Sequence, residues 1–464
     1  MKIENIDSKQ SVIQSQRLFF NNGATRSIKS RKQLLKKLKE VIQSEEAAIN
    51  QALFKDLGKS TSETFLSEVG LVLTEIDYFL RHLTQLAQPK RVKSSLLNWP
   101  SKDYINPEPY GVMLHISPWN YPFQLVFTPL IGAIAAGNTV VVKPSELAPH
   151  TADCVENIIK LAFPPEWVIV VQGGPEVGKS LLEERWDFMM YTGGVQVAKI
   201  VAAAAAKHLT PTLLELGGKN PCIVDNSAKI KVAARRIVFG KFLNCGQTCI
   251  APDYVIVHNS VKHALVKAMI QAIEESYGAD QSNSEDYGHI INDRHFKRLT
   301  SLLKSQNITY GGHTNPKKRY IQPTLIELSD TNNPLMEEEI FGPILPILTY
   351  ENDTDLTTII EQYEKPLSFY VFSGRKSWSK NIMRSYSYGG GIINDTLLQF
   401  TNRNLPFGGI GKSGTGAYHG KHSFYAFTHN KPYIKRSSWP DPSYRYAPYK
   451  KKMGFLRKLV KWLG

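Results

Sequence analysis

Short apolar runs and helical periods alternate along the middle of the chain. Runs rich in Val, Ile, Leu and Met predict strands at 112–116, 139–142, 167–171 and 188–191. Segments with helical character separate them, at 124–136, 152–163 and 195–208. Apolar strands that alternate with helices predict a parallel sheet built from right-handed βαβ units. In such sheets ligands bind beyond the carboxyl ends of the strands, so the loops after these strands are candidate site segments.

The preceding segments have different patterns. Residues from about 10 to 90 place apolar side chains such as Leu34, Leu38 and Val41 at helical spacing among lysines. They predict amphipathic helices that serve as scaffold. Residues 91–109 contain prolines and only short apolar stretches, which predicts a hairpin that stands off the domain.

The composition is that of a soluble globular protein of 464 residues, 42% hydrophobic and 21% charged. This length predicts two or three domains. Four irregularly spaced cysteines do not make a disulfide scaffold, and the N-terminus lacks an apolar signal segment, so we expect a reducing, cytoplasmic location. The uncharged stretch 124–142 contains Pro129 and Gly137, which predicts a helix, a turn and a strand rather than a membrane span.

Positive charge is concentrated at the C-terminal end. The net charge is +15, and the segment from Lys431 onward holds ten Lys or Arg and one acid, Asp441. Wound as a helix, residues 450–464 place apolar side chains on one half of the wheel and Arg and Lys on the other. This predicts a helix in a membrane interface, at the inner face of the membrane, that is too short to span. Packing on a partner subunit and a solvated disordered end are the alternatives; nucleic acid is not expected, because half the wheel is apolar.

Two segments carry candidate reactive groups. Residues 242–253 hold Cys249 in a polar turn that leaves the thiol accessible, and a thiol is the side chain closest to a useful nucleophile at neutral pH. A buried free cysteine, a disulfide half and a metal ligand are the alternatives. Glu215 lies between leucines and a glycine pair, where apolar surroundings bias a carboxylate toward a general base. The alternative for this glutamate is a capping role or a salt bridge to Lys219.

Two glycine-containing loops are candidate phosphate sites. Residues 173–180 fit the phosphate-loop pattern G-x-x-x-x-G-K-[ST], which would make Lys179 the key residue of a nucleotidase. The helix after this loop has room for barely two turns, which argues against that function. Residues 191–194 precede an alanine-rich helix whose N-terminus suits a pyrophosphate, although the full G-x-G-x-x-G fingerprint is absent.

Seven motifs occur in the order found in one known family. They are SPWNYPF at 117–123, KPSE at 143–146, YTG at 191–193, ELGG at 215–218, GQTC at 246–249, EEIFGP at 338–343 and PFGGIGKSG at 406–414. Together they resemble the NAD(P)-dependent aldehyde dehydrogenase superfamily. The short N-terminus and residues 251–254 and 418–420 resemble its class 3, fatty-aldehyde-type branch. The resemblance covers most of the chain.

The resemblance implies that the protein oxidises an aldehyde, medium- or long-chain aliphatic or otherwise apolar, to the carboxylic acid. Cys249 is similar to the family's nucleophile, which forms a thiohemiacetal and then a thioester. Asn120 is similar to the family's oxyanion donor, and Glu215 to the base that activates the hydrolytic water. No metal is implied. The alternatives are a nucleotidase that uses Lys179 and a non-enzymatic basic adaptor at a membrane surface.

The resemblance also implies a cofactor site for NAD, with NADP possible. The residues it assigns there are Lys143, Glu146, Thr192, Gly193, Gly194, Leu216, Glu339 and Phe341. Lys143 and Glu146 would bond the adenosine ribose, and Glu339 the nicotinamide ribose. Glu146 would repel a 2′-phosphate and so favour NAD, an effect that Lys143 would partly offset.

The fold class implied is α/β, with a Rossmann-like parallel-sheet cofactor domain, a second α/β catalytic domain and a small β arm that bridges subunits of a homodimer. The expected segments are 1–90 and 110–214 for cofactor binding, 215–418 for catalysis, 91–109 and 419–440 for the arm, and 441–464 for the basic tail.

Four further residues carry expectations. Cys245 is expected to be a small filler, or else the partner in a reversible disulfide that guards the nucleophile. Cys154 and Cys222 are expected to be buried free cysteines. Asn394 resembles an asparagine that supports the family's active site.

Overall fold

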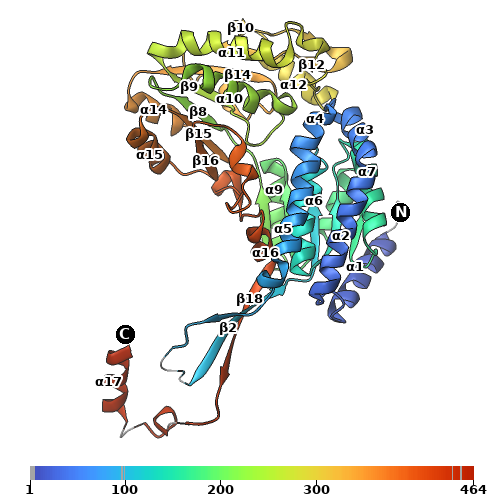
Figure 1. Cartoon of the computed structure of the whole chain (residues 1–464), viewed down its shortest axis with the longest axis vertical. Coiled ribbons are helices and arrows are strands. Elements are labelled where there is room, and N and C mark those ends of the chain that lie inside the picture. Colours follow the sequence, from blue (N-terminus) through green and yellow to red (C-terminus); the bar gives the residue numbers. More distant parts are fainter. Residues whose placement is uncertain (1–5, 96–97, 99, 442, 450–451, 464) are drawn as a thin grey trace.

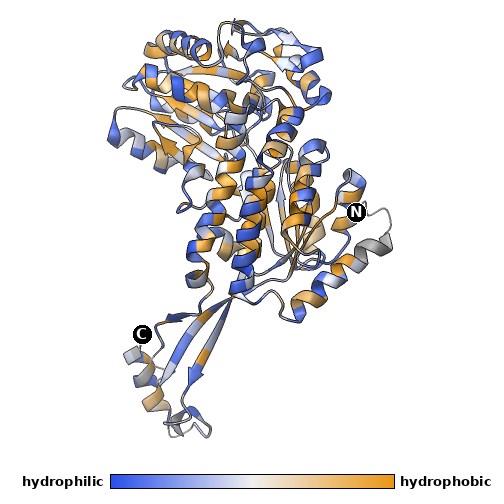
Figure 2. Cartoon of the chain, turned by 45° about the vertical axis from the view of Figure 1, so that its right-hand side comes forward, coloured by the Kyte–Doolittle hydropathy of each residue, from blue (hydrophilic) through white to orange (hydrophobic). Residues whose placement is uncertain are grey.

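A computed structural model describes residues 6–95, 98, 100–441, 443–449 and 452–463. The described chain forms two α/β bodies and a β arm that projects from one of them (Figure 1). Each body holds a mostly parallel sheet with helices packed against it, which confirms the expected fold class. Hydropathy colouring shows apolar strands enclosed by helices whose outer sides are hydrophilic (Figure 2).

The first body is organised by a six-stranded sheet. Its spatial order is β17 (Gly414–Thr415), β7 (Thr212–Glu215), β6 (Phe188–Thr192), β3 (Val112–Ile116), β4 (Thr139–Lys143) and β5 (Val168–Val170). All neighbours are parallel except β17, which pairs antiparallel with β7. Adjacent residues such as Met113 and Leu114 enter different cores, because successive side chains of a strand point to opposite faces. Both faces are covered, so these strands appear in the sequence as continuous apolar runs.

Helices cover both faces of this sheet. One face packs α2 (Ile28–Ser44), α3 (Glu46–Leu57), α5 (Gly70–Leu86), α6 (Gln124–Ala136) and α7 (Pro149–Ala162). The other packs α1 (Ile6–Asn21), α8 (Pro175–Leu182) and α9 (Val195–Ala206). Between α3 and α5 lie α4 (Thr61–Thr64) and a π-helical turn, η1 (Phe65–Val69). Such π turns are uncommon and frequently lie at functional positions.

The second body holds a seven-stranded sheet. Its order is β10 (Ile308–Tyr310), β13 (Thr324–Glu327), β14 (Ile344–Tyr350), β9 (Tyr254–His258), β8 (Pro221–Val224), β15 (Ser368–Phe372) and β16 (Gly390–Ile393), with only β10 antiparallel to its neighbour. One face packs α10 (Ile230–Phe242), α11 (Lys262–Tyr277) and α12 (Asp293–Leu303). The other packs α14 (Asp353–Ile360) and α15 (Lys376–Ser385).

Short elements complete this body. They are η3 (Leu243–Gly246), η4 (Asn259–Val261), η5 (Gln281–Asn283), η6 (Pro316–Lys318), α13 (Pro334–Glu337), η7 (Leu398–Thr401) and the strand pair β11 (Thr314–Asn315) and β12 (Tyr320–Ile321). A further short turn, η8 (Gly411–Ser413), directly precedes β17 of the first sheet.

The arm is a three-stranded antiparallel sheet, in the order β1 (Lys90–Val92), β2 (Ser101–Pro109) and β18 (Thr428–Arg436). The predicted hairpin is thus joined by a strand from the other end of the chain. Tyr104 and Tyr433, paired in register, stack with ring centroids 5.0 Å apart. Cross-strand aromatic pairs of this kind stabilise a narrow sheet that has no helix over it.

The C-terminal part of the chain refines the expected segment boundaries. Strand β17 lies in the first sheet, so the chain has already returned to the first body before residue 418. Helix α16 (Lys421–Ala426) packs on α6, and Phe424 and Phe427 are buried in the core of the first body. The paired strand of the arm begins at Thr428 rather than at the expected residue 419, because the aromatic residues before it are core residues.

The basic tail contains η9 (Ser443–Arg445) and the helix α17 (Met453–Leu463), which lies on the side of the arm and away from both bodies (Figure 1). Val460 and Trp462 are 65% and 78% exposed. Residues 450, 451 and 464 of the predicted tail lie outside the described residues. Within the part of the chain that is described, no helix combines the length and the apolar character needed to cross a membrane.

Candidate active site

A cavity lies where the strand order of the first sheet reverses. From β3 the chain proceeds outward to β4 and β5, and it then returns to place β6 and β7 on the other side of β3. Such a switch point is where open α/β sheets bind ligands. A cavity of about 720 Å³ adjoins it, lined by the segment after β3, the turn after β6 and loops of the second body. Asn120, Thr192, Gly193, Gly194, Glu215, Leu216, Cys249, Glu339 and Phe341 all line it.

The turn that leads to Cys249 is sharply bent. Asn244, Cys245 and Gly246 follow one another with φ of 53°, 53° and 71°, a left-handed run that L-residues rarely adopt. A Cβ on Gly246 would lie 2.3 Å from the carbonyl oxygen of Gly342, so only glycine fits there. The GQTC segment therefore packs directly against the EEIFGP segment. This contact brings Cys249 and Glu339 to one cavity.

The thiol of Cys249 is half-buried in this cavity. Burial raises the pKa of the thiol, and the nearby carboxylates of Glu339 and Glu215 raise it further. Hydrogen bonds from the backbone N–H groups of Cys249 and Ile250 act in the opposite direction. The same N–H groups favour a thiolate once it forms, because hydrogen bonds to a charged group stabilise it.

Glu215 is the last residue of β7 and is 1% exposed. Among the described residues, neither of its carboxylate oxygens has a hydrogen-bond partner. Burial raises the pKa of this carboxyl well above its ordinary value. The salt bridge to Lys219 that the sequence left open is absent, since the Lys219 ammonium lies 2.6 Å from Asp253. An unpartnered buried carboxylate beside a thiol has the properties of a general base.

Asn120 lies in the segment after β3 and is buried. Its side-chain Nδ2 donates to the backbone oxygen of Gln247 at 3.0 Å, which uses one of its two N–H bonds. Its backbone oxygen accepts from the side-chain amide of Asn244 at 2.7 Å. These bonds fix the amide against the turn that carries Cys249. The second N–H of the amide is the one available to a ligand in the cavity.

The N-terminus of α9 faces the same cavity. Its N-cap is Gly194, which supplies no capping side chain, and Val195 to Val197 in the first turn line the cavity. Open space lies where a Cβ of Gly194 would be. A helix N-terminus with free N–H groups and an open approach binds phosphate groups. The hydroxyl of Thr192, buried and without a hydrogen-bond partner in the described structure, lines the cavity beside this helix start.

Glu339 and Phe341 form the opposite wall. Burial raises the pKa of Glu339 to about 8, and the nearby Asp253 adds to the shift, while the backbone N–H of Gly218 lowers it. A Cβ on Gly217 would lie 2.1 Å from an oxygen of the Glu339 carboxylate, so a side chain at this position of the ELGG segment would displace that carboxylate. Phe341 packs edge-on against Trp119, with ring centroids 5.3 Å apart. The wall thus combines a carboxylate with aromatic surface, which suits the ribose and ring of a nicotinamide nucleotide.

Lys143 and Glu146 lie outside the lining of this cavity. Lys143 ends β4, one strand further along the sheet, and its ammonium lies 2.8 Å from the Glu146 carboxylate. A Cβ on Gly178 of α8 would lie 3.7 Å from the Lys143 side chain. Lys143 and Glu146 therefore lie at the edge of the sheet formed by the carboxyl ends of its strands. The turn at 192–194 lies at the same edge. An elongated dinucleotide that spans β6, β3 and β4 would reach both regions.

Comparisons with known proteins decide the family. A sequence profile described as the Aldehyde dehydrogenase family matches residues 6–432. The chain is 47% identical over 445 residues to 4,4′-diaponeurosporen-aldehyde dehydrogenase of Staphylococcus aureus (strain NCTC 8325 / PS 47), covering 96% of this chain and 97% of that protein. This chain belongs to the aldehyde dehydrogenase family.

Two further similarities refine this assignment. The chain is 45% identical over 420 residues to aldehyde dehydrogenase family 3 member A2 of Rattus norvegicus, covering 90% of this chain and 87% of that protein. A solved structure of the substrate-bound state of Staphylococcus aureus AldH matches with a TM-score of 0.95 and 46% identity, covering 97% of this chain and 99% of that one. The expected class 3 resemblance is confirmed. The protein is an NAD(P)-dependent oxidoreductase that converts an aldehyde to the carboxylic acid.

The nucleotidase alternative is not supported in this aldehyde dehydrogenase. Helix α8 begins at Pro175, so most of the 173–180 motif is helical rather than a loop. The N–H groups of Val177 and Gly178 donate to Gly174 within the helix and are not free to bind phosphate. Lys179 is exposed and pairs with Glu176 at 2.9 Å. The adaptor alternative is not supported either, because the family match covers the whole enzyme fold.

Several cavity residues were not found from the sequence. His295, on α12, packs beside Trp119 with ring centroids 5.0 Å apart, and burial lowers its pKa to about 4. Arg298 and Lys412 also line the cavity. Lys412 belongs to the PFGGIGKSG motif, so the sequence did contain a signal that could have identified this residue. His295 and Arg298 belong to no motif. They line the cavity only because α12 lies beside the loop after β3.

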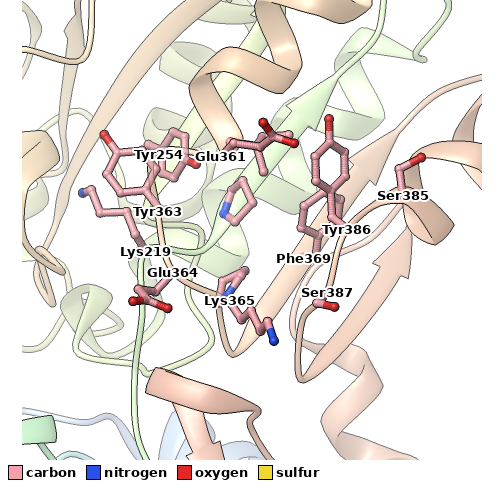
Figure 3. A pocket seen from close by; sticks show the side chains of 13 residues that line it. Lys219, Tyr254, Glu361, Tyr363, Glu364, Lys365, Phe369, Ser385, Tyr386 and Ser387 are labelled. Carbon is pink, nitrogen blue, oxygen red and sulfur yellow. The ribbon is translucent and has the colours of Figure 1, made fainter.

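A second cavity of about 430 Å³ lies beside the first in the second body (Figure 3). It shares Lys219, Tyr363, Glu364 and Lys365 with the main cavity. None of the residues assigned to catalysis or cofactor binding lines it.

The remaining sequence expectations concern residues around the site. Cys245 is buried in the core of the second body, and no described cysteine forms a disulfide. Cys222 is buried, but Cys154 is only partly buried, contrary to expectation, because it lies at the margin of the first core. Asn394 is exposed, and its side chain bonds both the N–H and the carbonyl of Ser373, so it secures the end of β15 rather than lining the cavity.

Proposed function

We propose that Cys249 is the nucleophile, Glu215 the base for hydrolysis and Asn120 the oxyanion donor of this aldehyde dehydrogenase. One observation carries the proposal. The three groups come from distant parts of the chain, yet they line one cavity in which the Glu215 carboxylate has no hydrogen-bond partner among the described residues. A nucleophile, a separate base and a preorganised amide are the groups that acyl chemistry through a thioester requires.

The steps follow from these groups. The Cys249 thiolate adds to the aldehyde carbon, and the oxygen that becomes negative accepts hydrogen bonds from the Asn120 amide and the Cys249 backbone N–H. NAD(P), held at the start of α9 and against the Glu339 wall, would supply the acceptor for the hydride that leaves this carbon, and Cys249 would then carry a thioester. Glu215 then takes a proton from water, whose oxygen adds to the thioester carbonyl. The carbon–sulfur bond breaks, the acid leaves, and the thiol is restored. Each preorganised oxyanion donor is worth about 3–4 kcal/mol of barrier.

The substrate that this site fits best is an apolar aldehyde. Cys249 packs in a cluster of apolar side chains: Leu243, Ile250, Leu367, Leu397, Phe400 and Phe407. We therefore propose medium- or long-chain aliphatic, or otherwise apolar, aldehydes. Burial of each further methylene is worth about 0.8 kcal/mol, so kcat/KM should rise roughly fourfold per carbon until the channel is filled. The aldehyde for which the Staphylococcus aureus relative is named belongs in the test panel.

We assign cofactor contacts by the same geometry. Thr192, Gly193 and Gly194 would hold the pyrophosphate at the start of α9. Leu216, Glu339 and Phe341 would hold the nicotinamide nucleotide. Lys143 and Glu146 would hold the adenosine ribose. The first body is then the cofactor domain and the second body the catalytic domain.

We further propose a homodimer formed through the arm. Strand β18 is the edge of the arm sheet, nine residues long, and within the described residues its outer edge has no pairing partner. Tyr433 and Ile434 on this strand are exposed. A long edge with apolar side chains is covered in most native proteins, and a two-fold dimer covers it symmetrically. Light scattering of the intact enzyme should give twice the chain mass, and Ile434→Pro should reduce it.

We propose that the tail helix α17 binds a membrane surface. Met453, Phe455, Val460 and Trp462 of this helix are exposed, and Arg457, Lys458 and Lys461 supply positive charge. An amphipathic helix with aromatic and basic residues inserts at the headgroup level of anionic lipid. This would concentrate the enzyme where apolar aldehydes dissolve.

The experiment that tests the catalytic assignment is NAD(P)H formation from a panel of aldehydes. Cys249→Ala should abolish it, while Lys179→Ala should leave it unchanged, because Lys179 is an exposed residue outside the cavity. Retained dehydrogenation by Cys249→Ala would falsify the assignment.

A further inference from the structure

A fully buried ion pair lies behind the catalytic segment. The Lys59 ammonium is 2.6 Å from the Glu68 carboxylate, and both side chains are 0% exposed. Lys59 precedes α4, and Glu68 lies in the π-helical turn η1. Removing two charges from water costs several kcal/mol per ion, and an apolar pair of similar volume is often as stable. A contribution to overall stability is therefore a weak explanation for this pair. The groups that the ammonium and the carboxylate contact suggest another role.

The ammonium of Lys59 holds the segment that carries Asn120. Besides Glu68, it donates to the backbone oxygen of Asn120 at 3.3 Å. It also lies 4.0 Å from the centroid of the Tyr121 ring, a cation–π contact that is strengthened by burial. These three contacts match the three N–H donors of an ammonium group.

The carboxylate of Glu68 holds the other end of the same segment. One oxygen accepts from Lys59, and the other accepts from the backbone N–H groups of Phe123 and Gln124, at 3.1 and 2.8 Å. Helix α6 begins at Gln124, and its N-cap Phe123 has no side chain that can cap. Glu68 therefore serves as a cap supplied from a distant part of the chain, with its negative charge at the positive end of the helix.

The segment between these anchors is joined directly to the turn of Cys249. The Asn120 side chain donates to the oxygen of Gln247, and the Tyr121 hydroxyl is 2.6 Å from the hydroxyl of Thr248, the residue before the cysteine. Hydrogen bonds thus link the segment held by Lys59 and Glu68 to Gln247 and Thr248, the two residues before Cys249.

We propose that the Lys59–Glu68 ion pair is a positioning device that sets the Asn120 amide at the place where the oxyanion forms. The inference rests on the proposed role of Asn120. A donor contributes its full effect only when it is held near 2.7–3.1 Å from the developing charge, so a shift of a fraction of an ångström weakens it. The pair fixes the backbone on both sides of Asn120 without touching substrate. It should therefore act on the steps that form an oxyanion, acylation among them, and should not affect cofactor binding.

The test uses variants of the full chain that keep side-chain size. Glu68→Gln removes the charge, and the double variant Lys59→Met with Glu68→Gln removes the pair without leaving an unpaired buried ion. The matched control is Asp56→Asn. Asp56 is a buried carboxylate of the same helical region that also accepts from the start of a helix, at Thr151 of α7, but it has no link to Asn120.

The measured quantity is the rate of the NAD(P)H burst in a single turnover, which reports acylation. We expect the rate to fall about 10- to 100-fold in both pair variants, with an unchanged KM for the cofactor and an unchanged rate of Cys249 alkylation. The control should keep the wild-type burst. A wild-type burst in the folded double variant would overturn the inference, and so would an equal fall in the control.

A double-mutant cycle separates this inference from the proposed function. Asn120→Ala alone should slow the burst about 100- to 1000-fold. Adding the pair substitutions to Asn120→Ala should cost little more, because the device would have nothing left to position. If Asn120→Ala has no effect, the proposed oxyanion role fails. If Asn120→Ala slows the burst, but the Lys59 and Glu68 substitutions slow it by the same factor with and without Asn120→Ala, the positioning inference alone fails.

Discussion

The Lys219 ammonium lies 2.6 Å from the Asp253 carboxylate and equally close to the backbone oxygen of Leu335. Lys219 is four residues after Glu215 and is the cation nearest to it in sequence. Because Lys219 is held by Asp253, the Glu215 carboxylate keeps both oxygens without a partner in the described structure. Lys219 and Asp253 thus form a structural ion pair, whereas Glu215 remains able to accept a proton.

Replacing Glu215 with Gln should uncouple the two halves of the reaction. The amide keeps the shape of the side chain but cannot accept a proton from water. We expect kcat to fall about 10²–10⁴-fold, the usual contribution of a positioned base. The first turnover should still form about one NAD(P)H per active site, because acylation does not need this base. Stopped-flow absorbance measures both. Loss of the burst together with kcat would show that Glu215 acts before the thioester forms.

The pH dependence should reflect raised pKa values at two groups. A carboxyl whose pKa is raised stays protonated, and therefore inactive as a base, until higher pH, so the acid limb of kcat should lie well above the ordinary carboxyl range. The burst rate should also increase with pH, because burial raises the pKa of the Cys249 thiol. Glu215→Gln should shift the alkylation profile of Cys249 to lower pH, since it removes one of the charges that raise this pKa. An unshifted profile would contradict the electrostatic coupling.

Cofactor preference should depend on Glu146. Its carboxylate, paired with Lys143, would lie beside a 2′-phosphate and repel it. Glu146→Gln should lower the KM for NADP about tenfold, equivalent to about 1.4 kcal/mol, with little change for NAD. Lys143→Met, which leaves Glu146 uncompensated, should raise the KM for NADP. Equal changes in the KM values for NAD and NADP would show that the 2′-phosphate does not lie beside Glu146.

Removal of the tail should affect location and not chemistry. A chain ending at Tyr449 lacks α17, which lies away from the cavity. We expect unchanged kcat/KM for a small soluble aldehyde and loss of co-sedimentation with anionic liposomes at low salt. Trp462→Ala should weaken the binding at all salt concentrations, whereas Arg457→Gln with Lys458→Gln should weaken it mainly at low salt. A change of oligomeric mass without any liposome binding would instead assign the helix to subunit packing.

Much of the site could be predicted because its motifs are local. The apolar runs 112–116 and 188–191 gave their strands to within one residue, since buried parallel strands have continuous apolar sequences. Cys249, Glu215 and Asn120 could be proposed as candidates because each lies in a short segment of distinctive residues. The start of α8 at Pro175 could not be found this way, because the 173–180 motif is compatible with either a loop or a helix.

The sequence by itself thus determined the α/β class, the order of the strands in the chain and the identity of the candidate reactive groups. Only the tertiary structure decided which charges are partnered: Lys219 with Asp253, Lys59 with Glu68, and Glu215 with none in the part of the chain that is described. It also decided that β18 completes the arm from more than 300 residues away. The physical reason is that periodicity and turn chemistry act over a few residues. Desolvation and hydrogen bonding depend instead on contacts between segments that only the folded chain brings together.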